Sequence, residues 1–276
     1  MRIAFLGGGN MAAALIGGLV AKGTDTRSIS VVEVSPAARE RLGARFPVHI
    51  ATAPDAAMQS ADVVVLAVKP QDAKSALASI TVGHRLVISI AAGLTLKTLS
   101  RWLGGHRKLV RCMPNTPALI GAGIAALYAL PEVSDDEKKK AESILRAAGE
   151  AVWVPEERLL DPVTAVSGNG PAYVFWMMEQ LAAAGERLGL PKEVAHKLAL
   201  HTILGAAKLA ASSSESPATL RKNVTSKGGT TEAALKVFEE ERLAERLLRA
   251  IEAGSRRATE MGEELGKQQD QEQGKD

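Results

Sequence analysis

Between residue 2 and about residue 154, short β-branched runs alternate with stretches of helical character. The strand-like runs cover residues 2–6, 29–34, 63–68, 86–90, 109–113 and 124–128. This alternation is typical of βαβ units and predicts a mainly parallel sheet. The run at 63–68 is apolar without alternation, as expected of a central strand that helices cover on both faces. The first half of the chain is therefore predicted to be a doubly wound α/β domain.

Beyond Asp161 the strand pattern ends, and Ala- and Leu-rich segments with apolar residues three and four apart take over. They predict helices at about 170–188, 192–212 and 240–265. Gly and Pro or Ser clusters at 189–191, 212–217 and 228–229 mark the breaks between helices. The second half is thus predicted to be all α-helical.

Charge and apolar content exclude several classes of function. The chain has 34 basic and 31 acidic side chains, and the basic ones are spread along it, so nucleic-acid binding is not indicated. No apolar run approaches the roughly 20 residues of a membrane span, so no membrane partner is expected. Cys112 is the only cysteine, which rules out an intramolecular disulfide and predicts a buried apolar thiol. We expect a cytoplasmic protein.

The first strand-like run leads directly into Gly7-Gly-Gly9-Asn-Met-Ala12 and then into an apolar helix. In this Gly-x-Gly-x-x-Ala pattern Gly7 permits a tight turn, Gly9 lets the backbone approach a pyrophosphate, and Ala12 allows close packing. An ordinary strand-to-helix turn is the alternative. The place of the Gly-x-Gly-x-x-Ala pattern, directly after the first strand of a βαβ series, favours a dinucleotide site.

The end of the second strand bears on which dinucleotide binds. Glu33 would suit the ribose of NADH, whereas Ser35 with Arg39 would suit the extra phosphate of NADPH. The combination favours NADPH, provided that Glu33 points away. Two other strand ends, at 67–70 and 90–93, should reach the same crevice. Lys69 either contacts the cofactor there or is an ordinary solvated lysine, and the sequence favours neither.

No metal site or hydrolytic triad is evident. The histidines are scattered, and the nearest two, His196 and His201, are five residues apart and off a shared helical face. No nucleophile, base and orienting acid occur in a suggestive arrangement.

Several segments resemble pyrroline-5-carboxylate reductases, in the right order and as far as about residue 265. They are residues 7–11, 68–70, 89–93, 111–117, 167–173 and 225–231, the last of which continues into the family's signature through Leu235. The resemblance implies reduction of 1-pyrroline-5-carboxylate to L-proline with NADPH or NADH, the final step of proline biosynthesis. It also implies a homodimer whose sites are completed at the interface, and such dimers often form rings of five.

The resemblance also implies a Rossmann-type NAD(P)-binding domain at 1–155 and an all-helical dimerisation and substrate domain at 156–266. The Gln-rich residues 267–276 are expected to form a disordered tail. The implied cofactor contacts are Leu6, Gly7, Gly9, Asn10, Met11, Ser35, Ala67, Val68, Lys69, Pro70, Ile90, Ala91, Ala92 and Asn223. The implied substrate contacts are Glu157, Gly229, Thr230 and Thr231.

The Gly228-Gly-Thr-Thr231 segment precedes an apolar-patterned helix at 233–238, and a helix start offers free amides to a carboxylate. The threonines could instead merely cap that helix. We expect Thr231 to hydrogen-bond the ring nitrogen of the imine and to be the catalytic residue. Lys227 stands where relatives commonly have proline, and it either adds a cation near the substrate or points to solvent.

Two alternatives remain open from the sequence. A different cyclic imine reductase or a β-hydroxyacid dehydrogenase could share the two-domain plan, because the cofactor domain does not identify a substrate. A non-catalytic NAD(P)H-binding sensor is the alternative of another class. The glycine-threonine segment argues against both.

Overall fold

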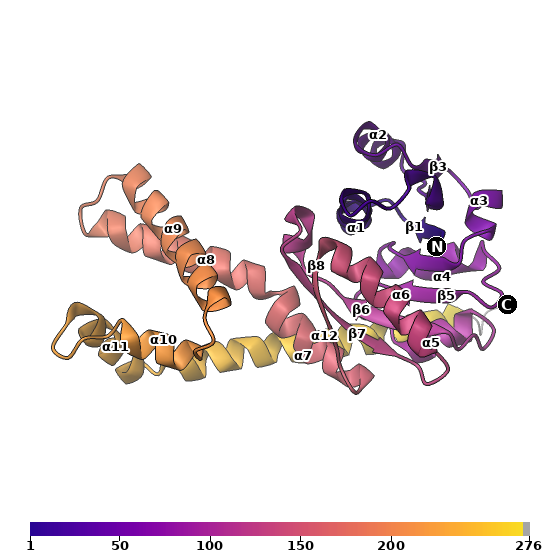
Figure 1. Ribbon diagram of the computed structural model, residues 1–276. Helices are drawn as coiled ribbons and strands as arrows, with labels where there is room; N and C mark the ends of the chain where they lie inside the picture. The colour runs from indigo at the N-terminus through magenta and orange to yellow at the C-terminus, as the bar shows by residue number, and fades with distance from the viewer. Residues whose placement is uncertain (273–276) are drawn as a thin grey trace. The chain divides into compact units, whose positions relative to one another are not determined.

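The computed structural model describes residues 1–272, with side chains through Leu265. It divides into two compact units (Figure 1). The first unit joins Met1–Gly168 to the segment from Gly254 onward, and the second is Asn169–Ala253.

The first unit is built on a sheet with the strand order β3-β2-β1-β4-β5-β6-β7-β8. The strands are β1 (Ile3–Leu6), β2 (Ile29–Val32), β3 (His49–Ala51), β4 (Val63–Leu66), β5 (Leu86–Ser89), β6 (Leu109–Met113), β7 (Gly123–Ala129) and β8 (Gly149–Trp153). All neighbouring strands are parallel except β6 and β7, which confirms the mainly parallel sheet. Strands β2 and β3 are added on one side of β1, and the strands from β4 onward on the other side. The position between β1 and β4 is therefore the topological switch point, which is where such folds bind ligands.

Helices cover both faces of this sheet, and alternate residues of strands such as β1, β4 and β5 divide between two cores. One core packs Phe5 and Val65 against α1 (Asn10–Ala21), α2 (Pro36–Arg45) and α6 (Asp135–Leu145). The other packs Leu6 and Val64 against α3 (Ala56–Gln59), α4 (Ala73–Ala78) and α5 (Leu96–Trp102). Each large apolar side chain buried this way stabilises the fold by about 1.5–3 kcal/mol.

The predicted helical half is confirmed in its elements. Asn169–Ala253 contains α8 (Gly170–Arg187), α9 (Lys192–Ser212), α10 (Pro217–Asn223), α11 (Thr230–Glu240) and the start of α12 (Leu243–Glu272). Helices α8 and α9 pack on each other, with Gly185 against Ala195. Short connecting helices η5 (Glu157–Leu159) and α7 (Leu160–Val163) precede this unit in the chain.

The compact units differ from the domain ranges expected from the sequence. The first unit extends past residue 155 to Gly168, and it takes in the second half of α12, where Leu265 joins the apolar core. Helix α12 therefore belongs to both units. It also continues to Glu272, into the range 267–276 for which we expected disorder, while residues 273–276 lie outside the described part of the chain.

Candidate functional site

The loop between β1 and α1 has the geometry that its glycines predict. Gly7 has a φ of 98°, and its amide donates to the carbonyl of Val32 at 2.8 Å. A Cβ on Gly7 would lie 2.7 Å from the carbonyl oxygen of Ala67, so only glycine fits between the two strand ends. Gly9 caps α1, and nothing lies within 4 Å of the Cβ position there. The start of α1 is therefore open to a ligand.

A cavity of about 640 Å³ lies at the carboxyl ends of the strands next to this loop. Seven of the predicted cofactor residues line it: Leu6, Gly7, Gly9, Ser35, Ala67, Val68 and Lys69. Asn10 and Met11 begin α1 beside it, and Pro70 follows Lys69 in the 3-10 turn η2 (Pro70–Asp72). An open cradle at a helix N-terminus, formed by glycines at the switch point of a parallel sheet, fits a dinucleotide pyrophosphate.

Glu33 also lines this cavity, and its carboxylate faces the glycine loop instead of pointing away. It accepts the amide of Gly8 at 2.7 Å and that of Ser35 at 2.8 Å. The Ser35 hydroxyl accepts the amide of Ala38 at 3.4 Å, capping α2. Arg39 donates to the carbonyls of Glu33 and Val34. The proviso attached to the NADPH preference is thus not met, although the hydroxyl and the guanidinium stand at the same strand end.

The second unit holds the glycine-threonine segment at the start of α11. Gly228 has a φ of 73°, and its amide donates to the Glu232 carboxylate at 2.7 Å. Gly229 is the N-cap, and no side chain caps the helix. Thr230 and Thr231 are exposed first-turn residues, so their hydroxyls are not used as caps. The first amides of such a helix have no intrahelical acceptor.

The other predicted contacts lie in different surroundings. Asn223 ends α10 in the second unit, and its side-chain amide donates to Glu215 at 3.0 Å. Ile90, Ala91 and Ala92 follow β5 in the first unit. Lys227 is exposed, which agrees with a solvent-facing side chain. Cys112 is buried as expected, and burial raises the pKa of its thiol, which disfavours the reactive thiolate.

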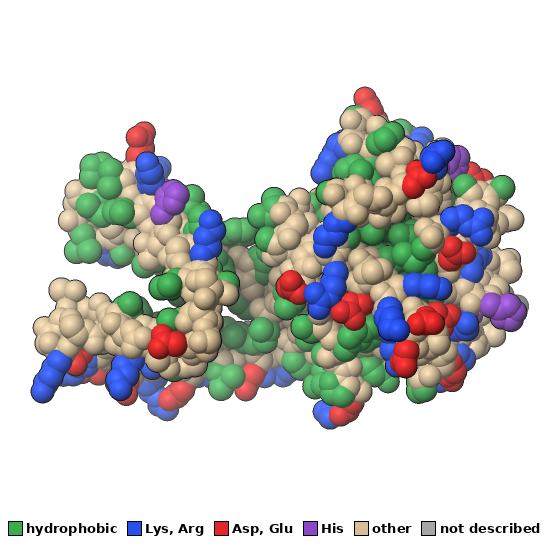
Figure 2. All heavy atoms as spheres, in the orientation of Figure 1, with side chains coloured by type: hydrophobic (Ala, Val, Ile, Leu, Met, Phe, Trp, Pro, Cys, Tyr) green, Lys and Arg blue, Asp and Glu red, His purple; other side chains and the backbone are tan. Residues whose placement is uncertain are grey.

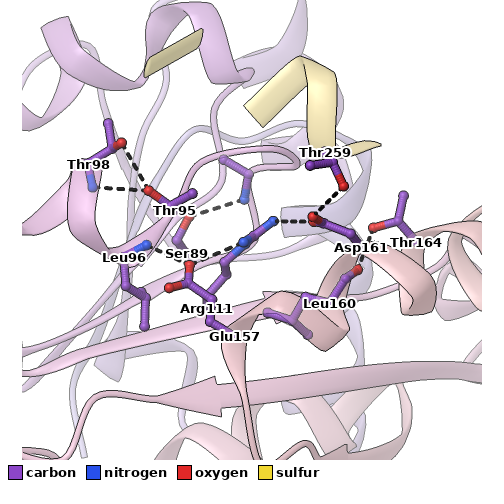
Figure 3. A network of polar contacts seen from close by, with 11 residues as sticks. Ser89, Thr95, Leu96, Thr98, Arg111, Glu157, Leu160, Asp161, Thr164 and Thr259 are labelled. Carbon is purple, nitrogen blue, oxygen red and sulfur yellow. Dashed lines mark hydrogen bonds and ion pairs between the residues drawn. The ribbon is translucent and has the colours of Figure 1, made fainter. Parts of the chain in front are cut away.

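Glu157 lies in the first unit, in a cluster of polar side chains centred on Arg111 (Figure 3). Its Oε1 accepts from the Arg111 guanidinium at 3.1 Å and from the amide of Leu96 at 2.7 Å. Arg111 also donates to Asp161 at 3.4 Å. We did not single out Arg111 from the sequence. The available signal was a charged residue inside an otherwise apolar strand, which must find partners when it is buried.

The histidine, cysteine and acidic side chains of the described residues do not gather in groups of three or more that could hold a metal ion. No helix in this part of the chain combines the length and apolar character needed to cross a membrane.

Comparison with known proteins covers both units. A family model described as pyrroline-5-carboxylate reductase dimerisation matches residues 157–261. A second, described as NADP oxidoreductase coenzyme F420-dependent, matches residues 2–93. The pyrroline-5-carboxylate reductase of Pseudomonas aeruginosa is 46% identical over 268 residues, which cover 96% of this chain and 98% of the relative.

Solved structures agree with the sequence matches. A pyrroline-5-carboxylate reductase from Coxiella burnetii superposes with a TM-score of 0.89 at 42% identity, covering 94% of this chain and 98% of the other. The Plasmodium falciparum pyrroline carboxylate reductase with NADP bound gives a TM-score of 0.82 at 29% identity, with coverage of 95% and 98%.

Proposed function

This chain belongs to the pyrroline-5-carboxylate reductase family, and from that membership we infer that it reduces 1-pyrroline-5-carboxylate to L-proline by hydride transfer from NAD(P)H. The reaction is the final step of proline biosynthesis. One structural observation carries this function. A single chain has both an open dinucleotide cradle and, at the start of α11, free amides beside two uncommitted threonine hydroxyls.

We propose that the glycine loop holds the cofactor pyrophosphate through Gly7, Gly9 and the first amides of α1. Ser35 and Arg39 would then face the adenosine end of the dinucleotide, since β2 lies on one side of β1. The strand ends at 67–70 and 90–92 lie on the other side. Asn223, at the end of α10, stays a further proposed cofactor contact.

NADPH is our proposed preferred cofactor. Ser35 and Arg39 supply a hydroxyl and a cation at the strand end where an extra ribose phosphate would lie. The relative from Plasmodium falciparum has NADP bound. Glu33 acts against the preference, because its carboxylate lies in the same cavity and would repel a phosphate. We therefore expect NADH to be used as well.

For the substrate we propose that the carboxylate binds the first amides of α11, beside Gly229 and Thr230. The ring nitrogen of a cyclic imine must be protonated before its carbon accepts a hydride, and the product amine keeps that proton. The hydroxyl oxygen of Thr231 would accept a hydrogen bond from this N–H and orient the ring. The bound dihydronicotinamide supplies the hydride.

The helical unit carries the family's dimerisation region, so self-association is part of this function. Helices α8 and α9 expose large apolar side chains along much of their length (Figure 2): Val174, Phe175, Trp176, Met177, Leu181, Val194, Leu198, Leu200, Leu204 and Leu209. An exposed apolar surface of this kind is typical of a protein interface. We propose a homodimer that assembles further into a decamer, in the cytoplasm.

The test mixes the purified full-length chain with 1-pyrroline-5-carboxylate and either NADPH or NADH, and follows loss of the reduced nicotinamide absorbance. Proline should accumulate in equal amount. A parallel reaction with NADP⁺ and β-hydroxyacids checks the related dehydrogenase activity, which we expect to be absent. Failure to oxidise either cofactor with the imine, despite cofactor binding, would favour the non-catalytic sensor.

A further inference from the structure

The polar cluster around Arg111 is not accounted for by the substrate role that we first expected for Glu157. Arg111 lies on β6, and its side chain is only 8% exposed. Its guanidinium reaches two carboxylates that follow the sheet in sequence, Glu157 at 3.1 Å and Asp161 at 3.4 Å (Figure 3). A buried arginine shared by two acids adds little to stability over an apolar core, but it fixes its partners in place.

What Glu157 holds is the end of the loop between β5 and α5. The carboxylate oxygen Oε1 that meets Arg111 also accepts the amide of Leu96, the first residue of α5. At the other end of the loop, the Ala91 amide donates to Ser89 at 3.3 Å and the Ile90 amide donates to Leu66. Glu157 therefore fastens the far end of a loop whose near end the sheet already holds.

Helix α12 also contacts this loop. Thr259 donates to the second oxygen of Asp161 at 3.0 Å (Figure 3). One turn further on, a Cβ on Gly262 would lie 3.0 Å from the carbonyl oxygen of Gly93. A Cβ on Gly93, whose φ is 78°, would lie 3.2 Å from Leu265. The loop backbone and the helix are thus in close contact, and Asp161 joins the helix to the Arg111 cluster.

The position of this loop in the sheet indicates which part of a dinucleotide it serves. In the order β2-β1-β4-β5, the pyrophosphate cradle lies at the end of β1 and the adenosine end is expected at β2. The loop after β5 is on the opposite side of the cradle. A dinucleotide extended across the switch point places its nicotinamide there.

We propose that Glu157, held by Arg111, is a positioning residue that fixes the 90–95 loop for the nicotinamide half of the cofactor. The proposal rests on the proposed cofactor function. In this proposal α12 also supports the 90–95 loop, through the contact between Thr259 and Asp161. Small displacements of such a loop change how well the nicotinamide is oriented.

The experiment measures binding to the free full-length protein for two probes, NADPH and 2′-phospho-ADP-ribose, which lacks the nicotinamide. Glu157→Ala should weaken NADPH binding by about tenfold and leave the fragment unchanged. Glu157→Gln keeps an oxygen that can accept from Leu96 and should recover most of the affinity. Equal weakening of both probes would indicate general damage and overturn the proposal.

A role limited to the substrate gives a different result and is the second way to overturn the proposal. If Glu157 acts on the imine alone, Glu157→Ala leaves NADPH binding unchanged and raises the KM for 1-pyrroline-5-carboxylate. Wild-type protein that binds NADPH without reducing the imine would defeat the proposed function, while the binding comparison would still decide the role of Glu157.

Two other variants complete the design. Glu156→Ala removes the neighbouring carboxylate, which is exposed and paired with Arg158, and it should leave both affinities unchanged. Thr259→Val breaks the contact to Asp161 without touching the buried pair, so it serves if Glu157→Ala does not fold. We expect it to weaken NADPH binding by about threefold. No change with Thr259→Val would remove α12 from the proposal.

Discussion

Thr231 combines three properties that suit a ligand contact. It is exposed, it lies in the first turn of α11, and its hydroxyl takes no part in capping that helix. Threonine near a helix start usually serves as the cap. In α11 the N-cap is Gly229, so the Thr231 hydroxyl is available for a ligand.

Replacing Thr231 by alanine should lower kcat much more than it changes cofactor affinity. A hydrogen bond to a charged group is worth about 1.5–3 kcal/mol, so kcat should fall by roughly 10- to 150-fold. Steady-state kinetics and NADPH binding to the same preparation check this. Thr231→Ser keeps the hydroxyl and should retain most of the activity. Unchanged kinetics in Thr231→Ala would end the assignment.

Single residues could be assigned from the sequence where the local backbone geometry requires one residue type. Gly7 and Gly9 could be assigned because a tight turn and an open helix start need glycine at those places. Arg111 was missed because its partners are 46 and 50 residues further along the chain, on elements that only the folded sheet brings near. The direction of Glu33 was undecided for the same reason, since Gly8 lies 25 residues away.

Among the elements, α6 shows how local sequence fixes a helix start. Ser134 accepts the amide of Glu137 at 3.3 Å, while the Glu137 carboxylate accepts the amide of Ser134 at 2.9 Å. This capping box satisfies two amides that the helix leaves unpaired. Its buried face, with Ala141 and Ile144, packs on the sheet. The start of α6 therefore supports the core below it.

Ser134→Ala should lower the free energy of unfolding by about 1 kcal/mol, because one amide of the first turn loses its acceptor. Urea unfolding followed by circular dichroism would measure the change. Ser143→Ala on the same helix is the matched control, since that hydroxyl donates only to the carbonyl of Lys140 among the described contacts. A loss in Ser143→Ala as large as in Ser134→Ala would contradict the capping argument.

The elements also show why sequence patterns identify some strands and miss others. The apolar run behind β4 was unmistakable because both of its faces are buried. Two strands were missed, β3 with three residues at the sheet edge and β8 with a mixed burial pattern, because neither has a continuous apolar run. The antiparallel pairing of β7 with β6 depends on the route of the chain through η3 (Thr116–Ile120) and not on strand composition.

For the whole molecule, the apolar faces of α8 and α9 are the strongest argument for association. Trp176 is 53% exposed and Phe175 is 59% exposed, which is unusual for large aromatic side chains in a lone chain. Aromatic residues of this kind often carry much of the binding energy at an interface. Self-association through the helical unit would bury them.

Trp176→Glu should shift the protein toward a monomer, because a charge would have to be buried in an apolar contact. Sedimentation or light scattering at several concentrations gives the mass. Gln59→Glu adds the same charge at an exposed polar position on α3, in the first unit, and should leave the assembly intact. If both variants keep the mass of the unmodified protein, the contact lies elsewhere.

Helix α12 has a consequence for how the protein is made. The first unit is discontinuous in sequence, since it needs both Met1–Gly168 and the segment after Gly254. The whole second unit, Asn169–Ala253, must therefore be synthesised before Thr259 and Leu265 can reach Asp161 and Gly93. During synthesis the sheet can form early, but the loop after β5 stays without its helical neighbour. We expect the nascent chain to acquire full cofactor affinity only after the residues from Gly254 to Leu265 have left the ribosome.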